Sequence, residues 1–231
     1  MKNIIIATIK EWNIANYFKL KESLASKYNF HLITQEEELN FQNVSKINPQ
    51  YIFFPHWSHK IDKDIYENFE SIIFHETDLP FGRGGSPIQN LIINKCYKTK
   101  ISAIECLEIL DSGDIYLQED YDLTQGNAQK IYEEISEIVF QKMIPQILEK
   151  KLIKQSQKGE VTSFKRRSKD ESNIETLKEL SLVNLYDFIR MLDAKTYPKA
   201  FLKLKEFTIE FSDVKLKDNK LIGRFEIDEK K

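Results

Sequence analysis

Short apolar runs alternate with amphipathic stretches along the first two thirds of the chain. Continuous apolar runs are typical of strands buried on both faces of a parallel sheet. They fall at residues 3–7, 30–33, 51–54, 71–74, 101–109 and 115–118. Strands separated by helical patterns predict an α/β fold, with a Rossmann-like, mostly parallel sheet and helices on both faces.

Two stretches have the spacing of helices that cover such a sheet. Residues 17–27 offer Phe18, Leu20, Leu24 and Ala25 to the core. Residues 126–147 carry a longer apolar face, made of Ile131, Ile135, Ile138, Val139 and Met143.

The chain changes character after this second helix. Residues 149–167 are highly polar and suggest a crossing to an appendage. Ser181 suits the N-cap of a helix over 181–192, and Asp218-Asn219 separates two strand-like runs, which predicts a β-hairpin. We therefore expect one domain at residues 1–155 and a small helix and β-hairpin subdomain at residues 156–231. The apolar hairpin would suit the surface of a homodimer.

One stretch, residues 74–89, joins features that favour ligand binding. A strand delivers His75 to its carboxyl end, and a Pro- and Gly-rich loop follows. A helix is expected to begin at Ser86-Pro87, with Ser86 as the N-cap and Pro87 in the first turn. The carboxyl ends of strands are where open α/β sheets bind ligands. A second candidate, Asp111, lies in a tight turn between two strand-like runs, Leu110-Asp111-Ser112-Gly113-Asp114.

Together the two stretches resemble the formyltransferase family that uses 10-formyltetrahydrofolate. That family carries His-x-Ser-Leu-Leu-Pro-x-x-x-Gly-x-x-Pro-Ile-Gln and, later, Leu-Asp-x-Gly-Asp. The matching residues are His75, Leu79, Pro80, Gly84, Pro87, Ile88, Gln89, Leu110, Asp111, Gly113 and Asp114. The resemblance implies an enzyme of one-carbon group transfer, with residues 1–155 as its catalytic domain, His75 as the base and Asp111 as its partner.

The family's catalytic set also includes an Asn two residues before the His, and that position is Ile73 in this chain. The hydrogen bond of that Asn must therefore come from another group or be dispensed with. His56 and His59 are candidate donors, although an exposed loop histidine is the simpler interpretation of either one. These two histidines with His75 also allow a metal interpretation, but no Cys or Glu completes a zinc spacing, and we predict no metal.

The resemblance implies that the loop after the third strand holds the pterin part of the folate co-substrate. The expected contacts to 10-formyltetrahydrofolate are Phe54, His56, Trp57, Ser58, Lys60, Ile61 and Asp114. Apolar walls here would agree with the usual lining of ligand pockets.

The expected contacts to the formyl acceptor lie on several segments. They are Trp12, Asn13, Thr77, Asp78, Arg83, Gly84, Arg166 and Arg167. Trp12 and Asn13 either line a pocket or cover the end of the sheet. Arg166 and Arg167 either form a solvated basic face or clamp a diphosphate.

The likeness is closest to sugar-nucleotide N-formyltransferases. It implies a nucleotide-linked aminosugar as acceptor, such as a 4-amino-4,6-dideoxy sugar of a pseudaminic- or legionaminic-type surface-glycan pathway. Three alternatives stay open: a catalytically silent folate or nucleotide-sugar binding homologue, an enzyme like methionyl-tRNA formyltransferase, and a structural nucleotide-sensing module, which only the general α/β pattern supports.

Composition narrows the partners. The 34 basic and 36 acidic residues give a net charge of −2, so no basic excess indicates nucleic acid. No run approaches the roughly 20 apolar residues of a membrane span, and the apolar start of the chain is too short for a signal peptide. Cys96 and Cys106 have neither zinc nor disulfide spacing. We expect a cytoplasmic protein without a membrane or nucleic-acid partner.

Overall fold

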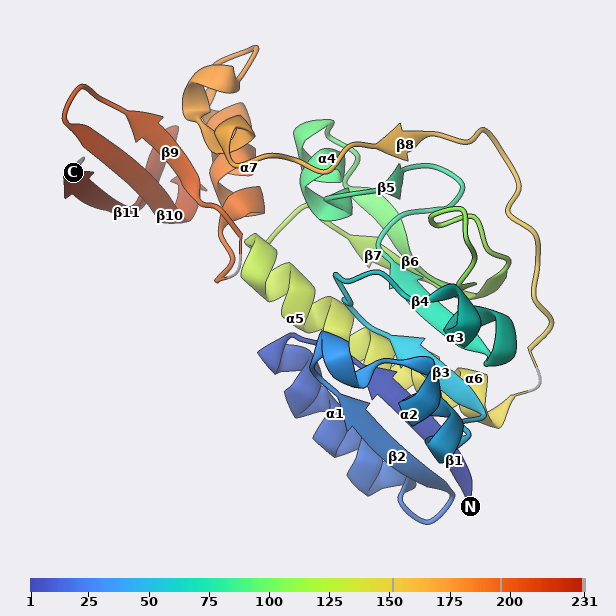
Figure 1. Ribbon diagram of the computed structural model, residues 1–231. Coiled ribbons are helices and arrows are strands. Elements are labelled where there is room, and N and C mark those ends of the chain that lie inside the picture. The colour runs from blue at the N-terminus through green and yellow to red at the C-terminus, as the bar shows by residue number, and fades with distance from the viewer. Residues whose placement is uncertain (151, 196, 230–231) are drawn as a thin grey trace. The chain divides into compact units, whose positions relative to one another are not determined.

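The computed structural model describes residues 1–150, 152–195 and 197–229. Its central sheet has six strands in these residues, in the order β2-β1-β3-β4-β6-β7 (Figure 1). The sheet strands are β1 (Lys2–Ala7), β2 (Tyr28–Ile33), β3 (Tyr51–Phe54), β4 (Ser71–His75), β6 (Lys98–Glu105) and β7 (Ile115–Asp122). The first four pair in parallel, whereas β6 runs antiparallel to β4. The predicted mostly parallel sheet is confirmed.

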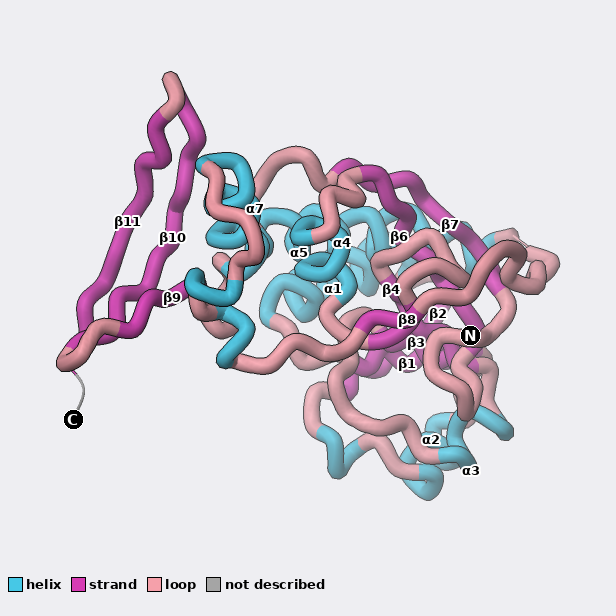
Figure 2. Tube along the Cα trace, turned by 90° about the horizontal axis from the view of Figure 1, so that it is seen from above, coloured by secondary structure: helices cyan, strands magenta, loops and turns pink. Residues whose placement is uncertain are grey.

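Helices cover both faces of the sheet. Figure 2 shows α1 (Glu11–Leu24) on the opposite side of the strands from α2 (Phe41–Ile47) and α3 (Lys63–Asn68). Side chains that alternate along β1 and β3 explain the packing on one face. The cluster beneath α2 and α3 consists of Ile5, Ala7, Ile33, Leu39, Val44, Ile52, Phe54 and Ile65. No helix in the described ranges is long and apolar enough to cross a membrane.

Several predicted elements have different ends, and two of the differences change which residues are buried. The first helix begins at Glu11 rather than at residue 17, and it buries Tyr17, Leu20 and Leu24. Phe18 and Ala25 were expected in the core, but both are exposed because the helix turns them away from the sheet. Strand β6 ends at Glu105, and the apolar residues Ile109 and Leu110 lie exposed in the following loop.

The predicted long helix is made of three pieces. They are α5 (Ala128–Ile138), a π-helical segment η2 (Val139–Met143) and α6 (Ile144–Glu149). Pro145 lies in the first turn of α6, where a proline is tolerated. The buried face of the first two pieces includes the predicted residues Ile131, Ile135, Val139 and Met143.

The C-terminal helix and hairpin are confirmed. Helix α7 (Leu182–Leu192) is capped by Ser181, whose Oγ accepts a hydrogen bond from the Asn184 amide at 3.1 Å. Strands β10 (Phe207–Lys217) and β11 (Lys220–Glu229) form the hairpin, and Asp218 and Asn219 both have positive φ, as a tight hairpin turn requires. A third strand that the sequence did not predict, β9 (Ala200–Lys203), pairs with β10.

Shorter elements complete the described chain. They are η1 (Glu36–Glu38), β5 (Arg83–Gly84), α4 (Pro87–Ile93), β8 (Ser163–Phe164), η3 (Asp170–Ser172) and η4 (Ile174–Thr176). Strands β5 and β8 form a two-stranded sheet.

The chain forms two compact units that alternate along the sequence. The first comprises residues 1–83, 100–120 and 133–163, and the second comprises residues 84–99, 121–132 and 164–231. The predicted domain boundary after residue 155 stays a prediction.

Candidate active site

His75 and Asp111 lie together in the first unit. His75 is the last residue of β4, and both side chains are about nine-tenths buried or more. Nδ1 of His75 is 3.6 Å from Oδ2 of Asp111, and Nε2 is 2.9 Å from the carbonyl oxygen of Gly82. A carbonyl oxygen only accepts hydrogen bonds, so Nε2 carries a hydrogen and donates it. In the neutral ring, Nδ1 is then the nitrogen that takes up a proton, and it faces a carboxylate.

The turn that carries Asp111 needs its particular residues. Asp111 has φ 53°, a left-handed conformation that Asp tolerates better than most side chains. A Cβ on Gly113 would lie 1.9 Å from the carbonyl oxygen of Glu105 in β6, so only glycine fits there. The turn is therefore pressed against the neighbouring strand.

Glu76 adds a second acidic group that the sequence prediction missed. Burial raises the pKa of its carboxyl group, while the nearby His75 acts in the opposite direction and Asp111 raises it further. The available signal was its position directly after the candidate histidine. The pair thus lies in a site where two carboxyl groups interact electrostatically with one imidazole.

Ile73 lies on the same face of β4 as His75, because side chains two residues apart point the same way. It is paired with Phe54 on one side and with Ile104 on the other. Its side chain packs against the apolar cluster beneath α2 and α3, as do Trp57 and Ile61. The position of the family's Asn is therefore part of an apolar surface.

The two candidate replacement donors have partners of their own. Nδ1 of His59 is 2.7 Å from Oε2 of Glu36. His56 meets the Trp12 ring edge-on, with centroids 6.1 Å apart, and burial together with Lys10 lowers its pKa to about 4. At neutral pH His56 is uncharged. Its predicted role as a donor, and that of His59, stay predictions.

The loop after β3 brings apolar and aromatic side chains together. The Trp57 ring lies 6.4 Å from that of Phe54 and 5.2 Å from that of His59. Nε1 of Trp57 is buried and has no hydrogen-bond partner among the described residues. Ser58 and Lys60 are exposed, and Ile61 is half-buried. Asp114 is half-buried, and its carbonyl accepts a hydrogen bond from the amide of Glu105.

Asn13 is buried and bridges two loops. Its Nδ2 is 3.0 Å from Thr8 Oγ1 and 3.0 Å from the carbonyl of Pro55, to which the Thr8 hydroxyl also donates. This network ties the turn after β1 to the loop after β3, so Asn13 covers the end of the sheet. Trp12 is half-buried beside it, with Lys10 above its ring.

The other acceptor-contact candidates of the first unit differ in exposure. Thr77 is fully buried, and its carbonyl accepts a hydrogen bond from Ser102. Asp78 is exposed and pairs with Lys100 at 3.1 Å. Arg83 is half-buried and donates twice to Gln157, a residue that the sequence prediction placed in the polar crossing without a role.

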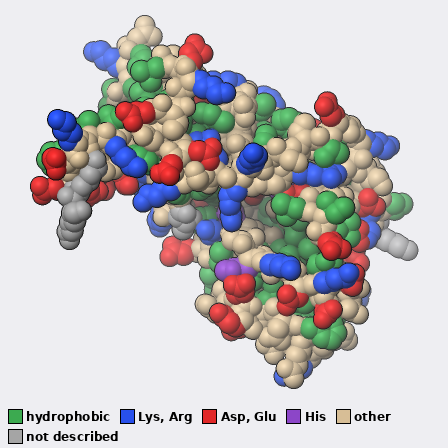
Figure 3. Space-filling view, turned by 45° about the horizontal axis from the view of Figure 1, so that its top comes forward, with side chains coloured by type: hydrophobic (Ala, Val, Ile, Leu, Met, Phe, Trp, Pro, Cys, Tyr) green, Lys and Arg blue, Asp and Glu red, His purple; other side chains and the backbone are tan. Residues whose placement is uncertain are grey.

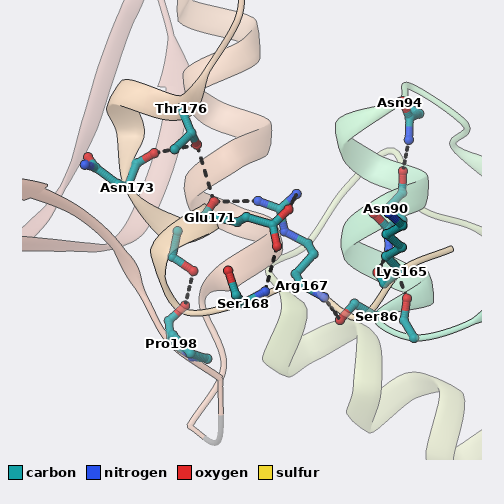
Figure 4. A network of polar contacts seen from close by, with 12 residues as sticks. Ser86, Asn90, Asn94, Lys165, Arg167, Ser168, Glu171, Asn173, Thr176 and Pro198 are labelled. Atoms are coloured by element: carbon teal, nitrogen blue, oxygen red, sulfur yellow. Dashed lines mark hydrogen bonds and ion pairs between the residues drawn. The ribbon is translucent and has the colours of Figure 1, made fainter.

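Three candidates belong to the second unit. A Cβ on Gly84 would lie 2.4 Å from the carbonyl oxygen of Phe164. Arg166 is exposed. Arg167 donates from Nη2 to the carbonyl of Glu171 at 2.6 Å, and its backbone amide donates to Ser86 (Figure 4). Its predicted contact with a diphosphate stays a prediction.

The expectation that Ser86 caps α4 is wrong. Ser86 has φ 52° and makes no side-chain capping bond, whereas an N-cap residue normally has extended backbone. Its hydroxyl instead binds the Arg167 amide and the Tyr197 hydroxyl. Pro87 does occupy the first turn.

Within the described part of the chain, no three His, Cys, Asp or Glu side chains lie so that they could hold a metal ion.

Comparison with known proteins shows clear relatives. Residues 169–228 match the family model described as methionyl-tRNA formyltransferase, C-terminal domain. A solved methionyl-tRNA formyltransferase from Clostridium thermocellum is 49% identical, with a TM-score of 0.96, and the match covers 100% of both chains. The chain is 30% identical to the methionyl-tRNA formyltransferase of Mycoplasma capricolum over 156 residues, which is 65% of this chain and 48% of the relative.

A more distant likeness extends to another group. A sugar N-formyltransferase from Shewanella has a TM-score of 0.71 at 14% identity, covering 97% of this chain and 96% of the other, and shares the fold. The chain spans between about half and two thirds of the length of the curated relatives it matches, at 48%, 64% and 61% for three of them.

Proposed function

The chain belongs to the formyltransferase family, and from this premise we propose that it transfers a formyl group from 10-formyltetrahydrofolate to a primary amine. The observation that carries the proposal is the buried pair of His75 and Asp111, 3.6 Å apart at the carboxyl end of β4. Formyl transfer to an amine needs a base for the amine proton and stabilisation of the charge that develops. The pair provides the first of these.

His75 would take up the amine proton at Nδ1. Gly82 holds the other ring nitrogen through its carbonyl, at 2.9 Å, and thereby fixes the ring. When the ring becomes an imidazolium, Asp111 faces the new charge, and a nearby carboxylate stabilises that form. The new bond joins the amine nitrogen to the formyl carbon, the bond from that carbon to the folate nitrogen breaks, and the proton passes to that nitrogen.

The residues of the first unit fit a folate. The indole N–H of Trp57 is buried with no hydrogen-bond partner in the described ranges, in the loop where the pterin is expected. A pterin offers nitrogen and oxygen acceptors and a flat face. Trp57 and Ile61 would supply an apolar wall from the cluster beneath α2 and α3. When bound, 10-formyltetrahydrofolate supplies the formyl carbon.

The acceptor we favour is the amine of methionyl-tRNA, which replaces the aminosugar as the leading candidate. The relative from Clostridium thermocellum is named for that activity and matches over the whole chain at 49% identity. The sugar N-formyltransferase shares only the fold, at 14% identity. A nucleotide-linked aminosugar remains the second candidate. Figure 3 shows basic and acidic side chains interspersed among the described residues that it draws.

The experiment compares the two acceptors directly. Purified protein is incubated with 10-formyltetrahydrofolate and either methionyl-tRNA or a nucleotide-linked 4-amino-4,6-dideoxy sugar, and formylated product is quantified by mass spectrometry. His75→Asn and Asp111→Asn should each lower kcat by about 10²–10⁴-fold, the usual contribution of a general base. His31→Asn is the matched control, because His31 lies in β2, where its ring nitrogen is within hydrogen-bond distance of Asn29 and Asn3.

The catalytically silent homologue makes the opposite prediction. Its argument is Ile73, where the family has a polar residue. Folate binding without product from either amine would favour that alternative. Product from the tRNA alone would reject both the silent homologue and the sugar acceptor.

A further inference from the structure

Gln157 uses its whole side-chain amide in hydrogen bonds within the first unit. Nε2 donates to the carbonyl oxygens of Asp111 and Gly113, both at 2.8 Å. Oε1 accepts from Nε and Nη2 of Arg83, at 3.1 and 2.7 Å. An amide has two donor hydrogens and two lone pairs, so every bonding position of this side chain is filled.

The two ends of this amide reach the two loops that contact His75. The nitrogen holds both sides of the turn that carries Asp111. The oxygen holds Arg83, the residue after Gly82, whose carbonyl receives the hydrogen bond from His75. Gln157 therefore connects the partner of Nδ1 to the partner of Nε2.

The backbone of the same segment is fixed on either side of Gln157. Gln155 exchanges two backbone hydrogen bonds with Ile115 at the start of β7, at 2.8 and 2.9 Å. Thr162 accepts from the Gly82 amide through its hydroxyl at 2.7 Å and from the Arg83 amide through its carbonyl at 3.0 Å. Residues 155–162 thus contact both the loop at residues 82–83 and the turn at residues 111–113.

We infer that Gln157 is a positioning residue for formyl transfer, which holds the Asp111 carboxylate against His75 without touching substrate. The inference rests on the proposed function. It assigns a role to a segment whose polar composition predicts only a crossing between domains. Gln157 bonds to the backbone on both sides of the left-handed Asp111, in a turn whose glycine lies against β6. Misplacing a catalytic group by about 1 Å costs roughly 10²-fold in rate.

Three variants separate the contacts. Gln157→Ala removes both ends of the bridge. Gln157→Glu keeps an acceptor for Arg83 but loses the donors, and it sets a negative oxygen against two carbonyls. Gln155→Ala is the matched control, since it is the same residue type in the same segment with an exposed side chain and a backbone that the substitution leaves intact.

We expect Gln157→Ala and Gln157→Glu to lower kcat by roughly ten- to a hundredfold, with KM for 10-formyltetrahydrofolate nearly unchanged, and Gln155→Ala to behave like the wild type. In an Asp111→Asn background, Gln157→Ala should cost nothing further, because the two changes remove the same interaction. Equal losses in both backgrounds, or full activity of Gln157→Glu, would overturn the inference.

Hydrogen exchange tests the positioning independently of turnover. Peptides covering the turn at residues 106–114 should exchange faster in Gln157→Ala than in Gln155→Ala or the wild type. Unchanged exchange would reject the positioning role of Gln157 even if the enzyme is active. Faster exchange in Gln157→Ala, together with no product from the wild type, would reject the proposed function but would still show that Gln157 holds the turn.

Discussion

At the residue scale, His56 should make the free energy of unfolding depend on pH. It has φ 57° and lies between Pro55 and Trp57, and burial with Lys10 lowers its pKa from 6.5 to about 4. The folded state therefore keeps His56 neutral between these values, whereas the unfolded chain binds a proton there. Because the unfolded state binds more protons, the free energy of unfolding should fall as the pH drops from about 6.5 towards 4.

The variant that tests this is His56→Asn. Asn tolerates positive φ and does not titrate in this range. We expect the free energy of unfolding, measured by urea denaturation at several pH values, to fall less steeply with acid in His56→Asn than in the wild type. One titrating group accounts for at most about 1.4 kcal/mol per pH unit. Parallel curves for the two proteins would show that His56 is protonated equally in both states.

Single residues also show what the sequence could predict. His75 and Asp111 were placed together because both stand in a recognisable motif. Asn13 and Arg83 stay predicted acceptor contacts, whereas their bonds to Pro55 and Gln157 are known only from the structure. These partners lie far away along the chain, so no local sequence pattern predicts them.

At the scale of elements, two serines before helices behave differently. Ser181 has extended backbone and caps α7, whereas Ser86 has left-handed backbone and its hydroxyl accepts from the Arg167 amide and the Tyr197 hydroxyl. Replacing Ser181 with Ala should lower the free energy of unfolding by about 1 kcal/mol. The measurement is chemical denaturation followed by circular dichroism.

Ser45 provides the contrast for this substitution. It is exposed in the middle of α2, where Ala is the better helix former. Ser45→Ala should therefore leave stability unchanged or raise it slightly. A loss of equal size at Ser45 and Ser181 would contradict the capping argument.

Elements were predicted where burial dominates the sequence pattern. β3 was placed at its observed bounds because it is a continuous apolar run. The start of α1 was missed because Lys10 caps it without a side-chain bond, so the sequence has no start signal. The four residues of β9 are too few to show a period.

At the scale of the whole molecule, a buried ion pair joins all three chain segments of the second unit. Asp187 and Arg190 are 2% and 1% exposed, and Oδ1 of Asp187 is 2.7 Å from Nε of Arg190. Lys95 and Tyr97 bind the other oxygen of Asp187, and Arg190 donates to the carbonyls of Leu123 and Gly126. Burial, and then Asp187, raise the pKa of Tyr97 to about 12.

Asp187→Asn should destabilise this unit strongly. It leaves a buried guanidinium without its counter-charge, a change that costs about 3–5 kcal/mol in other proteins. Asp170→Asn is the matched control, because Asp170 is 90% exposed and pairs loosely with Lys203 at 3.8 Å. Equal denaturation midpoints for the two variants would show that the ion pair is dispensable.

The division into two compact units could not be predicted from the sequence pattern. Local patterns describe neighbours along the chain, whereas each unit gathers three separate segments. The domain boundary predicted after residue 155 rests on a local change in composition, whereas the two units are defined by contacts between distant segments.

Because the segments of the two units alternate along the chain, the first unit is completed only after part of the second has been synthesised. During synthesis the chain emerges from its N-terminus at about 5–20 residues per second. His75 and Asp111 leave the ribosome first, while Gln157 and Thr162 arrive seconds later. Until then the hydrogen bonds from Gln157 and Thr162 to the two loops cannot form, so a nascent chain lacks the contacts that we propose position His75 and Asp111. These contacts come from residues 133–163, the last segment of the first unit to be translated.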